Sequence, residues 1–404
     1  MASLLENKKV YNGLLIAILM CGLFYIFSQS SQPFKFTDEQ IYYDLTKNLV
    51  EHNVYALDNL VPTAIKPPGF SFVLYAFFKI SDNIDLIKCV NFLFYLAAIF
   101  TGGLIAKKYS YNTSPTLYAI LICLYPVLFY TAGTLYPQTL ASLLLLVILY
   151  VTFKDVLNFK KAVVIGLLWG ILILSIPTFL IIFLFYLLFT RFSLKQKYLE
   201  WVFIIASILI GSWFLRNYFV FGKPVIFSTN LSINFYYGNS QFANDNPYAV
   251  ADIDYMDEGK FAKIENEVER DSALKSAALT FIKDNPFAAL KLYFIKFLNY
   301  FNYRNNLKTT EQQSIYYDII MFITYYFILI MIIIRIIDRK RFPLSKLEIF
   351  ILGCYVLNAL VTSVFFTRIR FRLPFDYLLI LMNAIYISNW LQYKKAKFHL
   401  SKGG

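Results

Sequence analysis

Long uncharged apolar runs are the feature that most constrains this chain. Residues 11–27 and 319–334 contain no charged side chain, and runs of this length approach the roughly 20 residues that cross a bilayer as a helix. The chain is 58% hydrophobic and 16% charged, with a mean hydropathy of +0.56. Lipid is therefore the solvent for much of it, and backbone polar groups in lipid must be satisfied within their own segment. The short alternating segments of a β-barrel are absent, so an all-α polytopic membrane protein is predicted.

Ten transmembrane helices are predicted from the apolar runs. Residues 114–153 are too long for one span, and Tyr136-Pro137 provides a break. Residues 162–190 have basic residues at both ends, which favours a short hairpin that turns near residues 175–178. The predicted spans are 11–27, 84–106, 114–131, 137–153, 162–175, 178–190, 199–215, 314–336, 347–366 and 374–392.

The basic residues predict which ends of the spans lie inside. Half of the 38 lysines and arginines fall in short loops and tails that alternate with uncharged turns, and short cytoplasmic loops are the ones enriched in such residues. Both termini are therefore predicted in the cytoplasm. The net charge of +13 follows this topology, so no nucleic-acid partner is expected.

The topology divides the chain into three regions. Residues 1–215 form an N-terminal transmembrane module with spans 1–7, residues 216–313 form an extracytoplasmic loop region with a polar, acidic middle from Asp245 to Asp271, and residues 314–404 hold spans 8–10 and a cytoplasmic tail. The first outer loop, 28–83, carries apolar residues at helical spacing from Asp38 to Glu51, a segment that Thr37 or Asp38 can cap. Further helices are expected at 69–80, on the membrane surface, and near 287–303.

Two adjacent acids, Asp38 and Glu39, follow the first span. They can serve simply as the negatively charged first turn of a helix. They can also provide a general base that takes a proton from an acceptor hydroxyl, or a ligand for a divalent cation. The sequence leaves these three interpretations open. No cofactor is therefore predicted with certainty, and a divalent cation is possible.

Three arginines, Arg368, Arg370 and Arg372, crowd the last outer turn. They can snorkel to lipid headgroups, but positive charge is disfavoured on the outer side. Guanidinium groups suit bidentate phosphate contacts. In an extended turn the three would share one face, so a bound phosphate is the favoured interpretation. Arg216, where the seventh span emerges, is a second phosphate contact or a plain membrane anchor.

The motifs, taken in order, resemble those of the C-type (GT-C) membrane glycosyltransferases, and most closely the bacterial relatives of dolichyl-phosphate-mannose protein mannosyltransferases and aminoarabinose transferases (families 39 and 83). The resemblance extends over nearly the whole chain. Its pieces are Asp38-Glu39 with Tyr42 or Tyr43, Lys66-Pro67-Pro68-Gly69-Phe70, the segment from Arg216 to Lys223, Ser228-Thr229-Asn230, Gly238-Asn239, Asp284-Asn285-Pro286-Phe287 with Lys296, and the segment from Arg368 to Pro374.

The resemblance implies a GT-C fold and an inverting sugar transfer at the outer membrane face. The donor would be a polyprenyl-monophosphate sugar, and the acceptor a hydroxyl of a cell-envelope lipid, glycan or protein. Asp38 would be the base with Glu39 beside it, and the Arg368–Arg372 turn, helped by Arg216, would hold the donor phosphate. Further candidates in the substrate loops are Tyr42, Tyr43, Lys66, Asn230 and Asn239. The hydropathy predicts an integral protein of an inner or plasma membrane, and the resemblance implies that this membrane is bacterial.

Two positions depart from the family pattern. Gln138 stands where relatives often carry an acid, and Ile176 stands where they often carry an arginine before proline. These departures leave the metal requirement open. They also leave open a non-catalytic relative. Independently of these departures, a transporter or flippase of lipid-linked sugars and an outer-face glycan polymerase or ligase are the alternative functions.

Overall fold

The computed structural model describes residues 5–57, 59–111, 114–154, 156–244, 261, 263–304 and 314–402. Within this part of the chain all regular structure is helical, apart from one isolated bridge between Ala56 and Pro62. The all-α prediction is therefore confirmed. Residues 245–260, which make up most of the predicted acidic middle of the second outer loop, lie outside the described residues.

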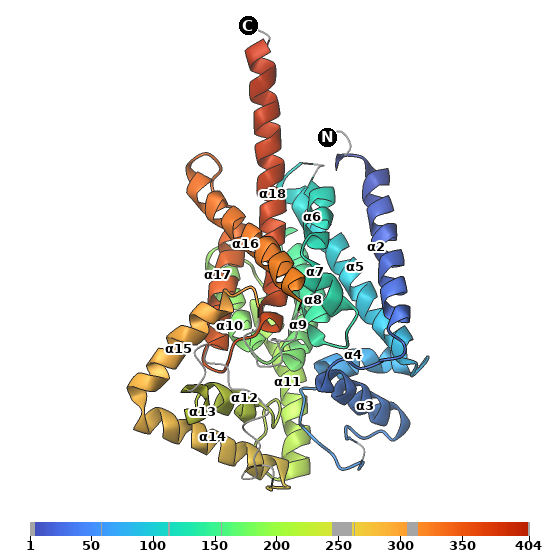
Figure 1. Ribbon diagram of the computed structural model, residues 1–404, viewed down its shortest axis with the longest axis vertical. Coiled ribbons are helices and arrows are strands. Elements are labelled where there is room, and N and C mark those ends of the chain that lie inside the picture. The colour runs from blue at the N-terminus through green and yellow to red at the C-terminus, as the bar shows by residue number, and fades with distance from the viewer. Residues whose placement is uncertain are drawn as a thin grey trace.

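Helices occupy all ten predicted spans (Figure 1). Five of the described helices are long and apolar enough to cross a membrane, or six if one bent pair counts as a single span; the total of ten crossings stays a prediction. The helices at the predicted spans are α2 (Lys8–Ser28), α5 (Ile84–Tyr109), α6 (Ser114–Cys123) with α7 (Pro126–Ala132), α8 (Pro137–Lys154), α9 (Phe159–Ser175), α10 (Phe179–Phe192), α11 (Leu199–Phe221), α16 (Ile315–Ile337), α17 (Lys346–Thr362) and α18 (Ile369–Lys402).

The third predicted span is not one straight helix. Helices α6 and α7 meet at an angle of 78°, so the prediction of a continuous helix over 114–131 was wrong. Pro126 is the first residue of α7 and lacks an N–H group. A proline also disfavours helical backbone in the residue before it, and Tyr125 accordingly leaves the helix with φ −112° and ψ 85°.

The two ends of the molecule differ in character. Both termini lie at one end of the molecule (Figure 1), and two hydrogen-bonded contacts join loops that carry predicted cytoplasmic lysines. Lys108 donates to the carbonyls of Phe153 and Lys154, and Lys346 donates to the carbonyl of Ser193. The charge pattern predicted that these segments share a side, and they do share one end of the fold.

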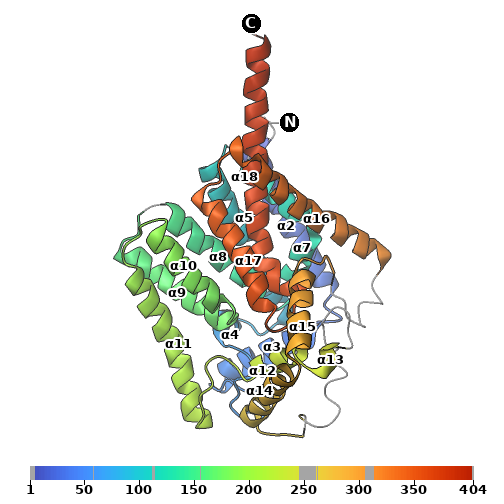
Figure 2. The same ribbon diagram turned by 90° about the vertical axis from the view of Figure 1, so that its left-hand side faces the viewer.

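The opposite end holds the two long loop regions (Figures 1 and 2). Their helices are α3 (Thr37–Glu51), α4 (Gly69–Phe78), α12 (Leu231–Gly238), α13 (Gln241–Asn244), α14 (Glu267–Asp284) and α15 (Pro286–Tyr300), while a short 3-10 helix, η3 (Asp338–Lys340), follows α16 at the other end. The predicted helices at 38–51, 69–80 and 287–303 are thus present. The predicted cap was wrong, because Phe36 is the N-cap of α3 and makes no side-chain bond.

Glu267 joins the two loop regions. Its carboxylate accepts hydrogen bonds from the Thr63 hydroxyl at 2.6 Å and the Ala64 N–H at 2.9 Å. Arg216, at the end of α11, donates to the carbonyl of Thr63 at 2.9 Å. These contacts fix the loop before Lys66 against the second outer region, and so place Lys66 at the wall of a cavity.

Candidate functional site

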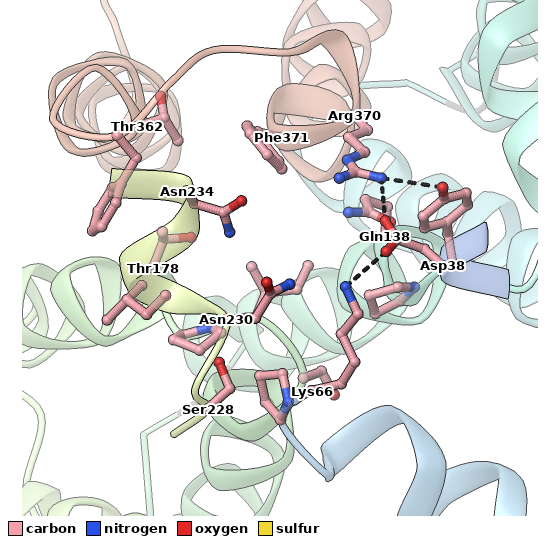
Figure 3. A pocket seen from close by; sticks show the side chains of 18 of the residues that line it. Asp38, Lys66, Gln138, Thr178, Ser228, Asn230, Asn234, Thr362, Arg370 and Phe371 are labelled. Atoms are coloured by element: carbon pink, nitrogen blue, oxygen red, sulfur yellow. Dashed lines mark hydrogen bonds and ion pairs between the residues drawn. The ribbon is translucent and has the colours of Figure 1, made fainter. Parts of the chain in front are cut away.

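A cavity of about 150 Å³ lies where the loop-bearing end meets the bundle. One water molecule needs roughly 10–15 Å³ by the same measure, so the cavity has room for a small organic group such as part of a sugar ring. Its walls come from segments far apart in sequence: α3, the segment before α4, the α7–α8 and α9–α10 turns, the start of α12, and the α17–α18 turn (Figure 3).

Asp38 lies between two cations in this wall. Lys66 Nζ donates to Asp38 Oδ1 at 2.7 Å, and Arg370 Nη1 donates to Asp38 Oδ2 at 2.7 Å (Figure 3). Arg370 also donates to the hydroxyl of Tyr136 at 3.1 Å. A carboxylate near the start of the chain and a guanidinium near its end are therefore in direct contact.

The two cations determine the charge state of Asp38. Burial alone would raise the pKa of this carboxyl, but the charges of Arg370 and Lys66 and their hydrogen bonds hold the pKa well below its usual range. Asp38 is therefore ionised at neutral pH. Burial also raises the pKa of the nearby Tyr136 hydroxyl, which stays protonated.

The charges around the cavity do not cancel. One carboxylate faces the two cations of Lys66 and Arg370, so these three lining residues carry one net positive charge. Arg368 adds another nearby: its buried Nε has no hydrogen-bond partner among the described residues. Burial and the neighbouring Arg370 lower the pKa of Arg368 to about 10, which still leaves it charged. The site is electrostatically prepared for an anion.

The prediction that the three arginines share one face of an extended turn was wrong. The segment is helical from Ile369 onward, with Pro374 inside α18. In a helix, residues two apart point about 200° from each other. Arg370 therefore faces the cavity, whereas Arg372 is buried in the bundle, paired with Asp376 at 3.3 Å.

Arg372 belongs to the structural core. Its guanidinium donates to the carbonyls of Tyr300 and Asn302 and lies 3.6 Å from the ring centre of Tyr325. Arg372 does not line the cavity, so the structure gives it no access to a donor phosphate there.

Glu39 points away from its neighbour Asp38. It is fully buried and accepts hydrogen bonds from the backbone N–H of Lys35 at 3.1 Å and of Leu135 at 2.9 Å. Lys88 lies 3.9 Å from the same carboxylate. These contacts hold the start of α3 against the α7–α8 turn, so Glu39 fixes the segment that carries Asp38 without lining the cavity.

The remaining predicted residues divide into two groups. Tyr42 and Asn230 line the cavity with Lys66. Tyr43 instead donates to the carbonyl of Asp82 at 2.8 Å, away from the cavity. Arg216 lies in the wall of a separate apolar groove beside Trp213.

Asn239 belongs to a clamp around Lys296. The Lys296 ammonium, fully buried, donates to Gly238 O at 2.8 Å, Phe365 O at 3.0 Å and Asn239 Oδ1 at 3.1 Å. The packing is close, since a Cβ on Gly238 would lie 1.4 Å from Phe365 O.

The clamp fixes the backbone just before the two arginines. Asn239 also donates to the carbonyl of Val364 at 2.8 Å, and the Thr367 hydroxyl donates to Lys296 O at 3.1 Å. Residues 364–367 are thereby held against α12 and α15. Lys296 thus fixes the position of the backbone that leads into Arg368 and Arg370.

Sequence reasoning assigned no role to several residues that line the cavity. Tyr136 bonds Arg370, and the Asn234 amide lies across the cavity from Arg370 (Figure 3). Within the described residues, neither the Asn230 nor the Asn234 side-chain amide makes a hydrogen bond. Asn230 is the N-cap of α12 and Asn234 lies within that helix. Their spacing of four residues was the available signal, because residues four apart at a helix start lie on one side of it.

The two departures from the family pattern, Gln138 and Ile176, both line the cavity. Among the described residues that line the cavity, Asp38 is thus the one carboxylate, and it is already paired with two cations. No group of three or more metal-ligating side chains occurs in the searched, described part of the chain. The donor set that the described residues provide here does not fit a divalent cation.

No protein-family model matches the sequence, and no curated protein matches it. Among solved structures, the chain is similar to the crystal structure of ArnT from Cupriavidus metallidurans bound to undecaprenyl phosphate. The sequences are 12% identical, the match covers 94% of this chain and 78% of that chain, and the TM-score is 0.48. A similarity of this degree assigns neither a family nor a substrate.

Proposed function

We propose that this protein is an inverting glycosyltransferase with a GT-C fold, acting at the outer membrane face. It moves a sugar from a polyprenyl-monophosphate donor to a hydroxyl of a cell-envelope lipid, glycan or protein. One observation carries the proposal: Asp38 lies in a cavity wall between Lys66 and Arg370, at the end of an apolar helix bundle opposite the termini.

The donor phosphate would bind to Lys66 and Arg370. A lipid-linked phosphate resides at the bilayer interface, and the cavity lies where the apolar bundle meets the loop-bearing end of the fold. The net positive charge of the lining residues complements a phosphate. Arg368, whose buried Nε has no hydrogen-bond partner among the described residues, does not line the cavity but adds positive charge near Arg370 and Asp38.

Donor binding would activate Asp38. The two cations that hold its pKa low would turn to the phosphate, and the pKa of Asp38 would return toward the ordinary range. The carboxylate would then be free to accept a proton. A weak base suffices, because glycosyl transfer passes through an oxocarbenium-like transition state in which the leaving bond is largely broken.

The transfer itself would be a single displacement. The acceptor oxygen forms a bond to the anomeric carbon as the bond from that carbon to the phosphate oxygen breaks. The electron pair leaves with the phosphate, whose growing charge Lys66 and Arg370 stabilise. The hydroxyl proton goes to Asp38, and attack opposite the leaving group inverts the anomeric centre.

Two amides at the start of α12, on its N-cap Asn230 and on Asn234, would hold the sugar. Asn230 and Asn234 face the cavity across from Asp38 and Arg370 (Figure 3). An amide offers both a donor and an acceptor, which suits sugar hydroxyls. Tyr42 supplies an aromatic ring in the same wall.

Mass spectrometry of envelope glycans and lipids would test the function. Cells that lack the chain would be compared with cells that express the wild type or the Asp38→Asn variant at equal levels. A glycan or lipid form that requires the wild type and is absent with Asp38→Asn supports the proposal. An unchanged profile in all three strains contradicts it, and accumulation of diphosphate-linked glycans would instead indicate a polymerase or ligase.

A further inference from the structure

Helix α15 has two opposite faces of unusual character. Its outward face exposes four large apolar side chains: Phe287 (88%), Leu290 (55%), Phe294 (57%) and Leu298 (70%). Its inward face buries Ala289, Leu292, Lys296 and Tyr300. At about 100° per residue, the exposed set covers an arc of about 80° and the buried set lies opposite to it.

This pattern reverses that of a helix on a water-exposed surface. Such a helix turns apolar residues inward and lysines outward. In α15 the ammonium of Lys296 is fully buried and hydrogen-bonded, while two phenylalanines and two leucines face outward. Apolar-out and polar-in is the arrangement of a helix surrounded by lipid.

The contacts of α15 place its C-terminal half beside membrane spans. Tyr293 Oη donates to the carbonyl of Leu360 at 3.2 Å, and the Asn358 amide donates to Tyr300 Oη at 2.9 Å. Asn358 lies four residues before the end of α17 at Thr362, a rise of about 6 Å. The C-terminal end of α15 therefore lies beside the body of α17, about one helical turn before the end of α17 at Thr362.

Figures 1 and 2 show the same path, with α15 running from its corner with α14 toward the bundle. We propose that α15 is embedded obliquely in the outer half of the bilayer, with Phe287, Leu290, Phe294 and Leu298 against lipid acyl chains. The second outer region thus returns into the membrane before the eighth span.

The exposed apolar face of α15 continues onto the neighbouring predicted span α17, and this continuity indicates that lipid chains cover the face. On α17, Val356 (48%) and Leu360 (39%) are also exposed, and Leu360 is the residue whose carbonyl accepts from Tyr293 of α15. One apolar surface thus extends from a predicted span onto α15. Lys291 is exposed at the edge of the same outward face, on the N-terminal half of α15. Its stem is long enough to carry the ammonium to headgroup phosphates.

Photocrosslinking tests the proposal independently of any enzymatic activity. Phe294→p-benzoylphenylalanine protein would be irradiated in nanodiscs of phosphatidylethanolamine and phosphatidylglycerol, and the adducts identified by intact mass spectrometry. The same substitution at Phe24 of α2, 78% exposed on a predicted span, is the lipid-facing control. Lys275, exposed on the polar helix α14, is the water-facing control.

The expected result is a phospholipid adduct at Phe294 with a yield within about threefold of that at Phe24, and none at Lys275. Phe287→p-benzoylphenylalanine, a second site on the same stripe, guards against a misfolded variant. Absence of lipid adducts at both α15 sites would overturn the proposal. So would an adduct with a second copy of the chain in place of lipid.

Discussion

The Asp38→Asn variant is expected to bind the donor phosphate more tightly than the wild type while transferring sugar far more slowly. In the free protein both cations are bonded to Asp38 at 2.7 Å, and a phosphate must displace that carboxylate. Each hydrogen bond to a charged group is worth about 1.5–3 kcal/mol. Releasing one such bond corresponds to roughly 10- to 100-fold tighter binding.

The same change removes the proposed base, and loss of general base catalysis lowers turnover by about 10²- to 10⁴-fold. Binding would be measured in nanodiscs by displacement of a fluorescent polyprenyl monophosphate with undecaprenyl phosphate. Asp82→Asn is the matched control, because Asp82 lies in the same outer loop with its side chain 59% exposed and paired with Lys47. Equal or weaker binding by Asp38→Asn would refute the competition between carboxylate and phosphate.

Four further outcomes follow from the structure. Glu39→Gln should lower the free energy of unfolding by about 1–3 kcal/mol, seen as a lower melting temperature, because Glu39 is buried and accepts two backbone N–H bonds. The affinity of this variant for undecaprenyl phosphate should stay unchanged in the displacement assay. Lys296→Met should reduce turnover at least tenfold, since three buried oxygens lose their donor, whereas Lys291→Met on the exposed side should retain wild-type turnover. Arg372→Gln should cost about 3–5 kcal/mol in denaturant unfolding, as expected for breaking a buried pair. Acid should destabilise the wild type more than Asp38→Asn: the folded pKa of Asp38 is depressed, so its stabilising effect is present above the unfolded value near 4 and is lost as pH falls below it, which thermal melts from pH 6 to pH 3 would show.

The sequence predicted the helices well because their signal is local. Each apolar run forms its helix irrespective of its partners, and the turns at residues 133–136 and 176–178 fall where the charge pattern required. The bend at Pro126 was missed although its cause is equally local. The run around it is so apolar that composition outweighed the proline in the prediction.

The meeting of Asp38 with Arg370 was also within reach of sequence reasoning. The predicted topology put Asp38 and Arg370 on the same outer side of the membrane. A sugar-transfer mechanism required the base and the phosphate-binding arginine to lie near each other. The geometry of their neighbours was harder to predict. Adjacent residues on a helix do not face the same way, which is why Glu39 turns from the cavity that Asp38 enters.

The last arginine turn shows what the sequence could not provide. Pro374 suggested that the span begins there and that the preceding arginines are extended. The structure continues α18 back to Ile369, and the helical period sends Arg372 into the core. Its partners, the carbonyls of Tyr300 and Asn302, lie about 70 residues earlier, and no local pattern reveals such contacts.

The most direct test of the central claim is turnover by purified protein in nanodiscs. Release of polyprenyl phosphate would be followed with a panel of polyprenyl-monophosphate sugars and envelope extracts as acceptors, for the wild type, Asp38→Asn and Asp82→Asn. The prediction is transfer by the wild type and Asp82→Asn, with loss of at least 10²-fold in Asp38→Asn. Transfer by Asp38→Asn at the wild-type rate would contradict the assignment of Asp38 as the base.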